Sequence, residues 1–188
     1  MERDKIAFVG RSNVGKSSTI RALTGVKVRV GKKPGTTIRP NLVPYGRYTI
    51  LDLPGFGFMG REEQEAMKDY IVRRLEEGRD IAFAVEVVDA RDFVEIARRW
   101  EARGQIPVEV ELYHFLNELG LNPIVAANKA DKIPGGARDE ILDTICTYLG
   151  LAPPWQGWRA VIIPFSAKTG EGLAELKTLI RERARAKG

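Results

Sequence analysis

The sequence predicts a single α/β domain over residues 1–188, built on a six-stranded, mostly parallel sheet with one antiparallel edge strand and helices on both faces. Two observations support this prediction. Short apolar runs alternate with longer segments of helical period, a pattern typical of strands that helices connect. No internal repeat and no Ser/Gly linker divides the 188 residues, and this length suits one sizeable core better than two.

The expected elements alternate regularly along the chain. Apolar runs predict strands at residues 6–9, 41–45, 48–51, 81–88, 123–127 and 161–163. The second and third of these turn at Gly46-Arg47 and form the antiparallel hairpin. Helices are expected at residues 16–23, 62–75, 108–119 and 139–149, and a last helix carries Leu173, Leu176 and Ile180. Residues 25–40 form an irregular loop, and loops of this length are more often functional than idle.

Charge and composition narrow the function classes. Thirty Lys and Arg against 25 Asp and Glu give a net charge of +5, which allows a polyanionic partner without requiring one. Cys146 is the only cysteine and His114 the only histidine, so an intramolecular disulfide, a Cys-based zinc site and a His-based triad are excluded. No signal-peptide pattern and no run of membrane-spanning length is present. We expect a cytoplasmic protein that does not associate with membranes.

The first expected strand leads into a phosphate-binding motif. The pattern G-x-x-x-x-G-K-[ST] is matched by Gly10-Arg11-Ser12-Asn13-Val14-Gly15-Lys16-Ser17, and Ser18 continues into a helical segment. Gly10 and Gly15 allow backbone N–H groups to face phosphate oxygens at a helix N-terminus. Lys16 is expected to bridge the β- and γ-phosphates and the Ser17 hydroxyl to bind Mg²⁺. The alternative, a glycine-rich turn with a chance lysine, is disfavoured because a strand and a helix flank the loop.

Two later loops favour guanine over adenine. Asn128-Lys129-Ala130-Asp131 follows the strand at residues 123–127, at the edge where open α/β sheets bind ligands. The Asp131 carboxylate can accept from N1–H and the exocyclic amine of guanine, whereas adenine lacks this pair of donors. Lys129 can cover the base with its stem, and Asn128 can tie the base to the phosphate loop. The competing interpretation, a charged helix cap, is weakened by the neighbouring phosphate loop. Phe165-Ser166-Ala167-Lys168 matches the loop whose backbone N–H meets guanine O6.

Two further segments are candidate sensors of the γ-phosphate. Asp52-Leu53-Pro54-Gly55 matches D-x-x-G, which places Asp52 to hold Mg²⁺ through water and the Gly55 N–H to meet the γ-phosphate. The alternative is a plain Pro-Gly turn. In the irregular loop, Gly35-Thr36-Thr37 supplies a hydroxyl that can close on Mg²⁺. Thr37 is the favoured ligand and Thr36 the alternative. Such loops act as order–disorder switches.

Two residues bear on the rate of hydrolysis. Phe56 stands where Ras-like enzymes carry a Gln that orients the attacking water, so we expect slow unaided hydrolysis. Asn13 is a candidate ligand for a monovalent cation beside the β- and γ-phosphates, which predicts stimulation by potassium. The alternative for Asn13 is a structural loop position. The expected catalytic residues are Lys16, Asn13, Thr37 and Gly55.

Together these motifs resemble those of translation-factor-related small GTPases with a single P-loop GTPase domain. Asp52-Leu53-Pro54-Gly55-Phe56-Gly57-Phe58 is similar to the Asp-Leu-Pro-Gly-Tyr-Gly-Tyr signature of the EngB (YihA) family, and the run from Gly10 to Ser18 fits the same family. Asn128 and the two phenylalanines depart from the usual bacterial pattern and indicate an archaeal-like member. The resemblance implies a GTP/GDP-binding, Mg²⁺-dependent switch in large ribosomal subunit assembly, linked to cell division and septation.

The partners implied by this resemblance are the large ribosomal subunit or its rRNA. The alternative is a GTP-gated module that binds a protein of the division machinery. A monomer is expected, with a transient dimer in the GTP state left open. Arg181, Arg183, Arg185 and Lys187 are candidates for contacts with rRNA phosphates or for a merely solvated helix face. Trp155 and Trp158 could offer platforms to RNA bases, but such tryptophans more often pack against their own domain.

Overall fold

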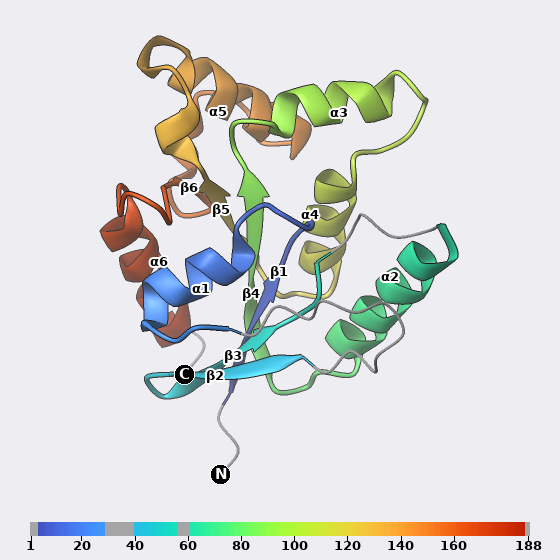
Figure 1. Ribbon diagram of the computed structural model, residues 1–188, viewed down its shortest axis with the longest axis vertical. Coiled ribbons are helices and arrows are strands. Elements are labelled where there is room, and N and C mark those ends of the chain that lie inside the picture. The colour runs from blue at the N-terminus through green and yellow to red at the C-terminus, as the bar shows by residue number, and fades with distance from the viewer. Residues whose placement is uncertain (1–3, 29–39, 56–60, 187–188) are drawn as a thin grey trace.

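The computed structural model describes residues 4–28, 40–55 and 61–186 and has a six-stranded sheet at its centre, in the order β2-β3-β1-β4-β5-β6 (Figure 1). The strands are β1 (Lys5–Val9), β2 (Asn41–Tyr45), β3 (Tyr48–Asp52), β4 (Ile81–Asp89), β5 (Ile124–Asn128) and β6 (Ile162–Pro164). The β2–β3 pair is antiparallel and the other pairs are parallel. The predicted sheet, including its antiparallel edge strand, is therefore confirmed.

Six α-helices occur in the described residues, five of them between strands and one after β6. They are α1 (Lys16–Thr24), α2 (Arg61–Glu76), α3 (Phe93–Glu101), α4 (Val108–Glu118), α5 (Arg138–Tyr148) and α6 (Leu173–Ala186). Short 3₁₀ turns lie at Ala130–Lys132, Gly135–Ala137 and Trp155–Trp158. Helix α3 was not predicted, although Phe93 and Ala97 are buried one turn apart on its inner face while Arg98 and Arg99 are exposed.

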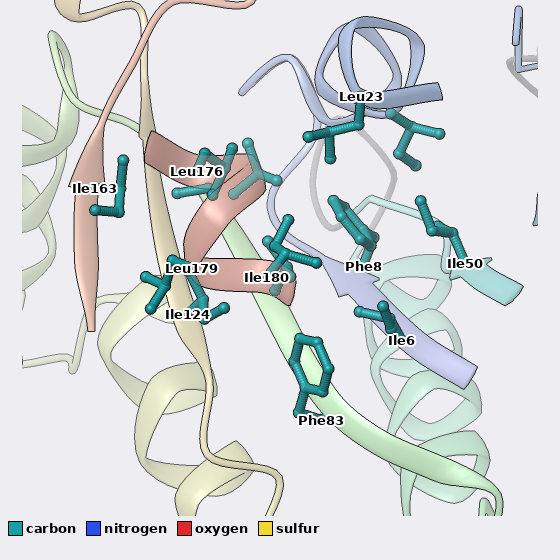
Figure 2. Packing of buried hydrophobic residues seen from close by; sticks show 14 of the residues in the cluster. Ile6, Phe8, Leu23, Ile50, Phe83, Ile124, Ile163, Leu176, Leu179 and Ile180 are labelled. Atoms are coloured by element: carbon teal, nitrogen blue, oxygen red, sulfur yellow. The ribbon is translucent and has the colours of Figure 1, made fainter. Parts of the chain in front are cut away.

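Apolar packing places helices on both faces of the sheet, as the sequence predicts. Helices α1 and α6 cover one face, where Ile20 and Ile180 pack against strand residues such as Phe8 (Figure 2). Helices α2 and α4 cover the other face through residues such as Ile71 and Leu116, and α3 and α5 extend that layer over β5 and β6. Each strand of the centre is thus buried on two sides, which explains its near-continuous apolar sequence.

The two tryptophans singled out in the sequence belong to the protein's own core and turns. Trp155 is buried, and its indole N–H donates to Asp139 at 2.8 Å. The indole N–H of Trp158 donates to the carbonyl of Ala152 at 2.7 Å. Both donors are satisfied within the domain, as indole N–H groups usually are when buried. The packing interpretation of this loop is confirmed over the RNA-platform one.

The strand order also fixes where a ligand can bind. Because β1 lies between β3 and β4, the connection after β1 leads to the strands on one side of it, and a later connection leads to the strands on its other side. Such a switch point opens a crevice at the carboxyl ends of the strands. The loops after β1, β3, β4, β5 and β6 all meet at this edge. Among the described residues, no helix is long and apolar enough to cross a bilayer.

Candidate functional site

The loop between β1 and α1 has the backbone geometry of an anion-binding turn. Gly10 and Gly15 have φ angles of +148° and +93°, and Asn13 is also left-handed at +68°. A Cβ on Gly15 would lie 2.2 Å from Nδ2 of Asn128, so no larger residue fits there. The loop ends at the N-terminus of α1, where the helix dipole favours negative charge. The predicted phosphate loop therefore has both the shape and the electrostatics that its motif requires.

A buried pair of opposite charges lies beneath this loop. Lys16, in the first turn of α1, forms an ion pair with Asp52 at the end of β3, and both side chains are less than a tenth exposed. The second carboxylate oxygen of Asp52 accepts from Nδ2 of Asn41 at 3.2 Å. Burial of a charge requires such a partner, because the water that would otherwise solvate it is excluded. Two residues predicted to meet phosphate and Mg²⁺ are thus brought together.

The D-x-x-G segment lies directly against the phosphate loop. A Cβ on Gly55 would lie 3.1 Å from the backbone N and Cα of Ser12, so a side chain at residue 55 would crowd the phosphate loop. Leu53 is fully buried in the core and can contribute to the site only through its backbone. The proximity of Gly55 to Ser12 is what a sensor of the terminal phosphate needs.

Asn128 connects three loops on the opposite side of the site. Its Nδ2 donates to the carbonyl of Val14 at 2.9 Å, and its Oδ1 accepts from the backbone N–H of Ala167 at 3.0 Å. The Asn128 side chain is 3% exposed. The backbone N–H of Ala130 in turn donates to the carbonyl of Phe165 at 3.1 Å. The predicted tie between Asn128 and the phosphate loop is confirmed, and the Ser166-Ala167 loop joins the same network.

Lys129 and Asp131 present the charged groups of this side. Lys129 is left-handed at φ +65°, and its Nζ donates to the carbonyl of Asn13 at 2.9 Å and pairs with Asp89 at the end of β4. These contacts extend the lysine stem across the cleft. The Asp131 side chain is 15% exposed and lies 4.0 Å from Nζ of Lys132. Asp131 therefore keeps a carboxylate that a bound group can reach.

A cleft of about 670 Å³ brings together the base side of the site and the end of the phosphate loop. Its lining includes the predicted residues Gly15, Ser18, Asn128, Lys129, Asp131, Ser166 and Ala167. Lys16 and Asp52 do not line it, and Val14, Ala130 and Phe165 have buried side chains and do not line it either. Arg21, Arg91 and Lys168 also line the cleft and were not singled out as site residues. In the sequence they are marked only by their proximity to the motifs, because exposed Lys and Arg residues follow no periodic pattern that would single them out.

Arg11 does not line this cleft. Its Nε lies 3.0 Å from a carboxylate oxygen of Glu109, a residue of α4 that is 4% exposed. Beside this pair, Glu86 on β4 is fully buried, and neither of its carboxylate oxygens has a hydrogen-bond partner in the described residues. Burial, reinforced by the nearby charge of Glu109, holds the pKa of Glu86 well above its ordinary value. Glu86 therefore holds its proton more tightly than an ordinary glutamic acid, and Arg11 links the phosphate loop to α4.

The donor chemistry of the phosphate side suits Mg²⁺. Ser17 is half-buried beside Lys16, and Asp52 offers a buried carboxylate, which are hard oxygen donors of the kind that Mg²⁺ prefers. No cluster of three His, Cys, Asp or Glu side chains occurs in the described residues. A magnesium ion held here would therefore draw its other ligands from phosphates and water. Gly35, Thr36, Thr37 and Phe56 lie outside the described residues, so their predicted roles stay predictions.

Comparison with known proteins agrees with this geometry. A sequence model of a family described as "50S ribosome-binding GTPase" matches residues 5–129. A Methanopyrus kandleri protein named "Probable GTP-binding protein EngB" is 53% identical over 98% of this chain and 94% of its own length. A crystal structure described as "a probable GTP-binding protein engB" covers 97% of this chain and 99% of its own, with 44% identity and a TM-score of 0.87.

A more distant structure has the same domain inside a longer protein. Era, solved with MgGDPNP and nucleotides 1506–1542 of 16S ribosomal RNA, is 25% identical with a TM-score of 0.66. The alignment covers 97% of this chain and 57% of the Era chain. The strand order, the phosphate loop and the Asn128 network are therefore those of a P-loop GTPase domain, and the chain belongs to the EngB family of GTP-binding proteins.

Proposed function

We propose that this protein is a GTP-dependent switch that binds the large ribosomal subunit during its assembly. The observation that carries the proposal is the network around Asn128, which joins the phosphate loop, the Asp131 segment and the Ser166-Ala167 loop around one cleft. The family's description as 50S ribosome-binding supports the choice of partner. The Era structure, which contains a ribosomal RNA segment, supports rRNA as the surface that is recognised.

Each side of the site has its own role in this proposal. Asp131 accepts from the N1–H and exocyclic amine of guanine, and Lys129 covers the base. The phosphates lie on the loop formed by residues 10–18, with Lys16 between the β- and γ-phosphates. Ser17 and Thr37 bind Mg²⁺ directly and Asp52 binds it through water. Bound Mg²⁺ supplies positive charge that stabilises the phosphate oxygens during hydrolysis.

Hydrolysis is proposed to be slow and stimulated by potassium. Phe56 has no polar group to orient water, and Asn13 can add a side-chain oxygen to a monovalent cation site beside the phosphates. Single-turnover GTP hydrolysis measured in potassium chloride and sodium chloride at equal ionic strength tests this part. A faster rate in potassium that Asn13→Ala abolishes is expected. Equal rates in the two salts would reject the potassium site.

Binding to ribosomal subunits tests the switch itself. Purified protein loaded with GDP or with a non-hydrolysable GTP analogue is sedimented with large and with small subunits. We expect co-sedimentation with the large subunit in the GTP state and release in the GDP state. Binding that ignores the nucleotide would contradict a switch. Failure to bind in either state would favour the second candidate, a GTP-gated module for a division protein, as the family resemblance to septation factors suggests.

A further inference from the structure

A second groove lies at the opposite end of the sheet from the nucleotide cleft. It has a volume of about 420 Å³ and lies between the turn that joins β2 to β3 and the C-terminal half of α6. Because β3 runs parallel to β1, this turn is at the amino ends of the strands, whereas the nucleotide loops are at the carboxyl ends. Figure 1 shows the end of α6 beside β2, well away from the loop that precedes α1.

The rim of this groove carries only positive charge. Arg47 lies on the hairpin turn, and Lys177, Arg181 and Arg185 follow one another at four-residue intervals along α6. Four residues of α-helix rise about 6 Å, so the three form one stripe. None of the residues that line the groove is acidic. A cluster of four cations favours a polyanion at this surface.

Arg183 does not belong to this stripe. Its guanidinium is turned away and donates to the carbonyls of Asn122 and Ala160 at 2.5 and 2.6 Å. The arginines that the sequence marked as one candidate RNA-contacting tail therefore have different functions. Arg183 fixes the end of α6 to neighbouring loops, while Arg181 and Arg185 line the groove.

The floor of the groove is aromatic and apolar. Tyr48 is 6% exposed, its hydroxyl donates to the carbonyl of Ala184 at 2.5 Å, and the Arg47 guanidinium lies 5.0 Å from its ring centre. Tyr45 is half-buried beside Arg181, whose charge opposes the rise in the tyrosine pKa that burial causes. Ile180 completes the floor. A cationic rim over an aromatic floor is the combination by which proteins bind single-stranded nucleic acid, with phosphates on the cations and bases on the rings.

We propose that this groove docks a single-stranded segment of RNA, with Lys177, Arg181 and Arg185 on its phosphates and Tyr45 under a base. This inference rests on the proposed ribosomal function and names the surface through which rRNA is held. Because the groove and the nucleotide cleft are at opposite ends of the sheet, RNA docks here equally well in the GDP and GTP states. The nucleotide-dependent part of subunit binding then comes from the other end of the molecule.

Fluorescence anisotropy of a labelled RNA of about 12 nucleotides tests the docking. Affinity is measured between about 50 and 200 mM KCl for the wild type and for the triple variant Lys177→Ser/Arg181→Ser/Arg185→Ser. Each phosphate contact on a single strand makes the slope of log K against log salt more negative by about 0.7, so the slope of the triple variant should be about 2 less steep than that of the wild type. Tyr45→Leu should weaken binding about tenfold with the slope unchanged, because stacking carries no counterions.

A matched control carries the same loss of charge elsewhere. Arg98, Arg99 and Arg103 are exposed at the far end of α3, and replacing all three by serine should leave the salt slope within about 0.5 of the wild type. Unchanged GDP affinity verifies that each variant is folded. An equal loss in the control and groove variants, or no loss in the groove variant, would overturn the proposal. Polyglutamate that competes with RNA as tightly as unlabelled RNA would overturn it in favour of an acidic protein.

Sedimentation with large subunits separates this proposal from the proposed function. Groove variants that bind subunits as tightly as the wild type at all salt concentrations would reject the groove as the docking surface while leaving the switch intact. Wild-type protein that binds the RNA through the groove but binds no subunit in either nucleotide state would reject the ribosomal function instead. The expected result is a groove variant with weaker subunit binding that still responds to GTP.

Discussion

The two halves of the nucleotide site are held together by different forces. On the base side, Asn128 joins Val14 and Ala167 by uncharged hydrogen bonds of 2.9 and 3.0 Å. On the phosphate side, Lys16 and Asp52 form a buried ion pair. The uncharged hydrogen bonds around Asn128 are fully formed without a ligand. In contrast, the Lys16 ammonium would bind phosphate more strongly than it binds Asp52, and the Asp52 carboxylate would bind hydrated Mg²⁺ more strongly than it binds Lys16. The base side is therefore preformed, and the phosphate side is where binding changes partners.

Removing the Lys16 side chain should weaken nucleotide binding on the phosphate side more than any other change considered. Lys16→Met takes away the charged donor for the β- and γ-phosphates, so GTP affinity should fall about a thousandfold. It also removes the charged partner of the buried Asp52 carboxylate, which keeps its hydrogen bond from Asn41, and should destabilise the fold by about 3 kcal/mol. Calorimetric titration and urea unfolding measure both effects.

The double variant Lys16→Met/Asp52→Asn is the control for this change. It replaces a buried charge by a neutral amide and should recover most of the stability but none of the affinity. Recovery of GTP binding in the double variant would mean that the loss in the single variant was a folding defect, which would contradict the assigned role of Lys16.

Asn128→Ala should weaken nucleotide binding on the base side, with a smaller effect than that of Lys16→Met. Both cross-loop hydrogen bonds are lost and a buried donor and acceptor lose their partner, so the free energy of unfolding should fall by about 2 kcal/mol. GDP affinity should fall about a hundredfold, because the loops around the base are no longer held. Asn117→Ala on the surface of α4, where the amide bonds the nearby Tyr113 carbonyl and connects no separate loops, is the control and should change stability by less than about 0.5 kcal/mol. Equal effects of the two variants would argue against a preformed base side.

Glu86 allows a buried acid without a hydrogen-bond partner in the described residues to be compared with one that has a partner. Its pKa is raised from 4.5 by burial and by Glu109, so the folded state holds a proton that the unfolded chain releases above about pH 4.5. Stability should therefore fall as the pH rises from 4.5 toward the raised pKa. Glu86→Gln should remove this slope, and Glu86→Leu should stabilise the protein at pH 8 by about 1–3 kcal/mol.

Thermal unfolding between about pH 4 and pH 9 measures the effect of Glu86. The exposed Glu118→Gln serves as the control and should leave the pH profile unchanged. A Glu86→Leu variant that is less stable than the wild type at pH 8 would show that the carboxyl has a partner after all.

Asn41→Ala should give the smallest change. Its amide donates to the second oxygen of Asp52 at 3.2 Å, and loss of this hydrogen bond to a carboxylate should lower stability by about 1 kcal/mol. Leu42 on the same strand is 57% exposed, and Leu42→Ala should change stability by less than about 0.5 kcal/mol. Chemical denaturation of both variants checks the prediction. A loss beyond about 3 kcal/mol for Asn41→Ala would place Asn41 among the essential partners of Asp52 rather than its auxiliary ones.

Much of the architecture can be predicted because its signals are local. Apolar runs and the glycines of residues 10–15 place all six strands and the phosphate loop. Helix α3 was not predicted although its inner-face pattern is present, because Phe93 and Ala97 give only a short apolar pattern on a helix of nine residues. The tie from Asn128 to the phosphate loop was predicted because its motif fixes which loops meet at the sheet edge.

The remaining contacts depend on tertiary packing that no local pattern encodes. Arg11 belongs to the phosphate motif, yet its side chain pairs with Glu109 on α4, nearly a hundred positions away. Glu86 stands in an apolar strand, and its raised pKa follows first from its complete burial and then from the charge of Glu109, which α4 places nearby. The pairing of Lys129 with Asp89 follows from the alignment of β4 with β5, where Asp89 lies opposite Asn128.

Nucleotide competition with the Asp131→Asn variant tests the central claim, that a preformed base side selects guanine. Unlabelled GDP, XDP and ADP compete with a fluorescent GDP on the wild type and with a fluorescent XDP on the variant. An asparagine amide matches the C2 carbonyl of xanthine where aspartate matches the C2 amine of guanine. The wild type should prefer GDP and the variant should prefer XDP, each by about a hundredfold or more, with ADP excluded from both. An Asp131→Asn variant that keeps the wild-type preference for GDP would contradict the claim.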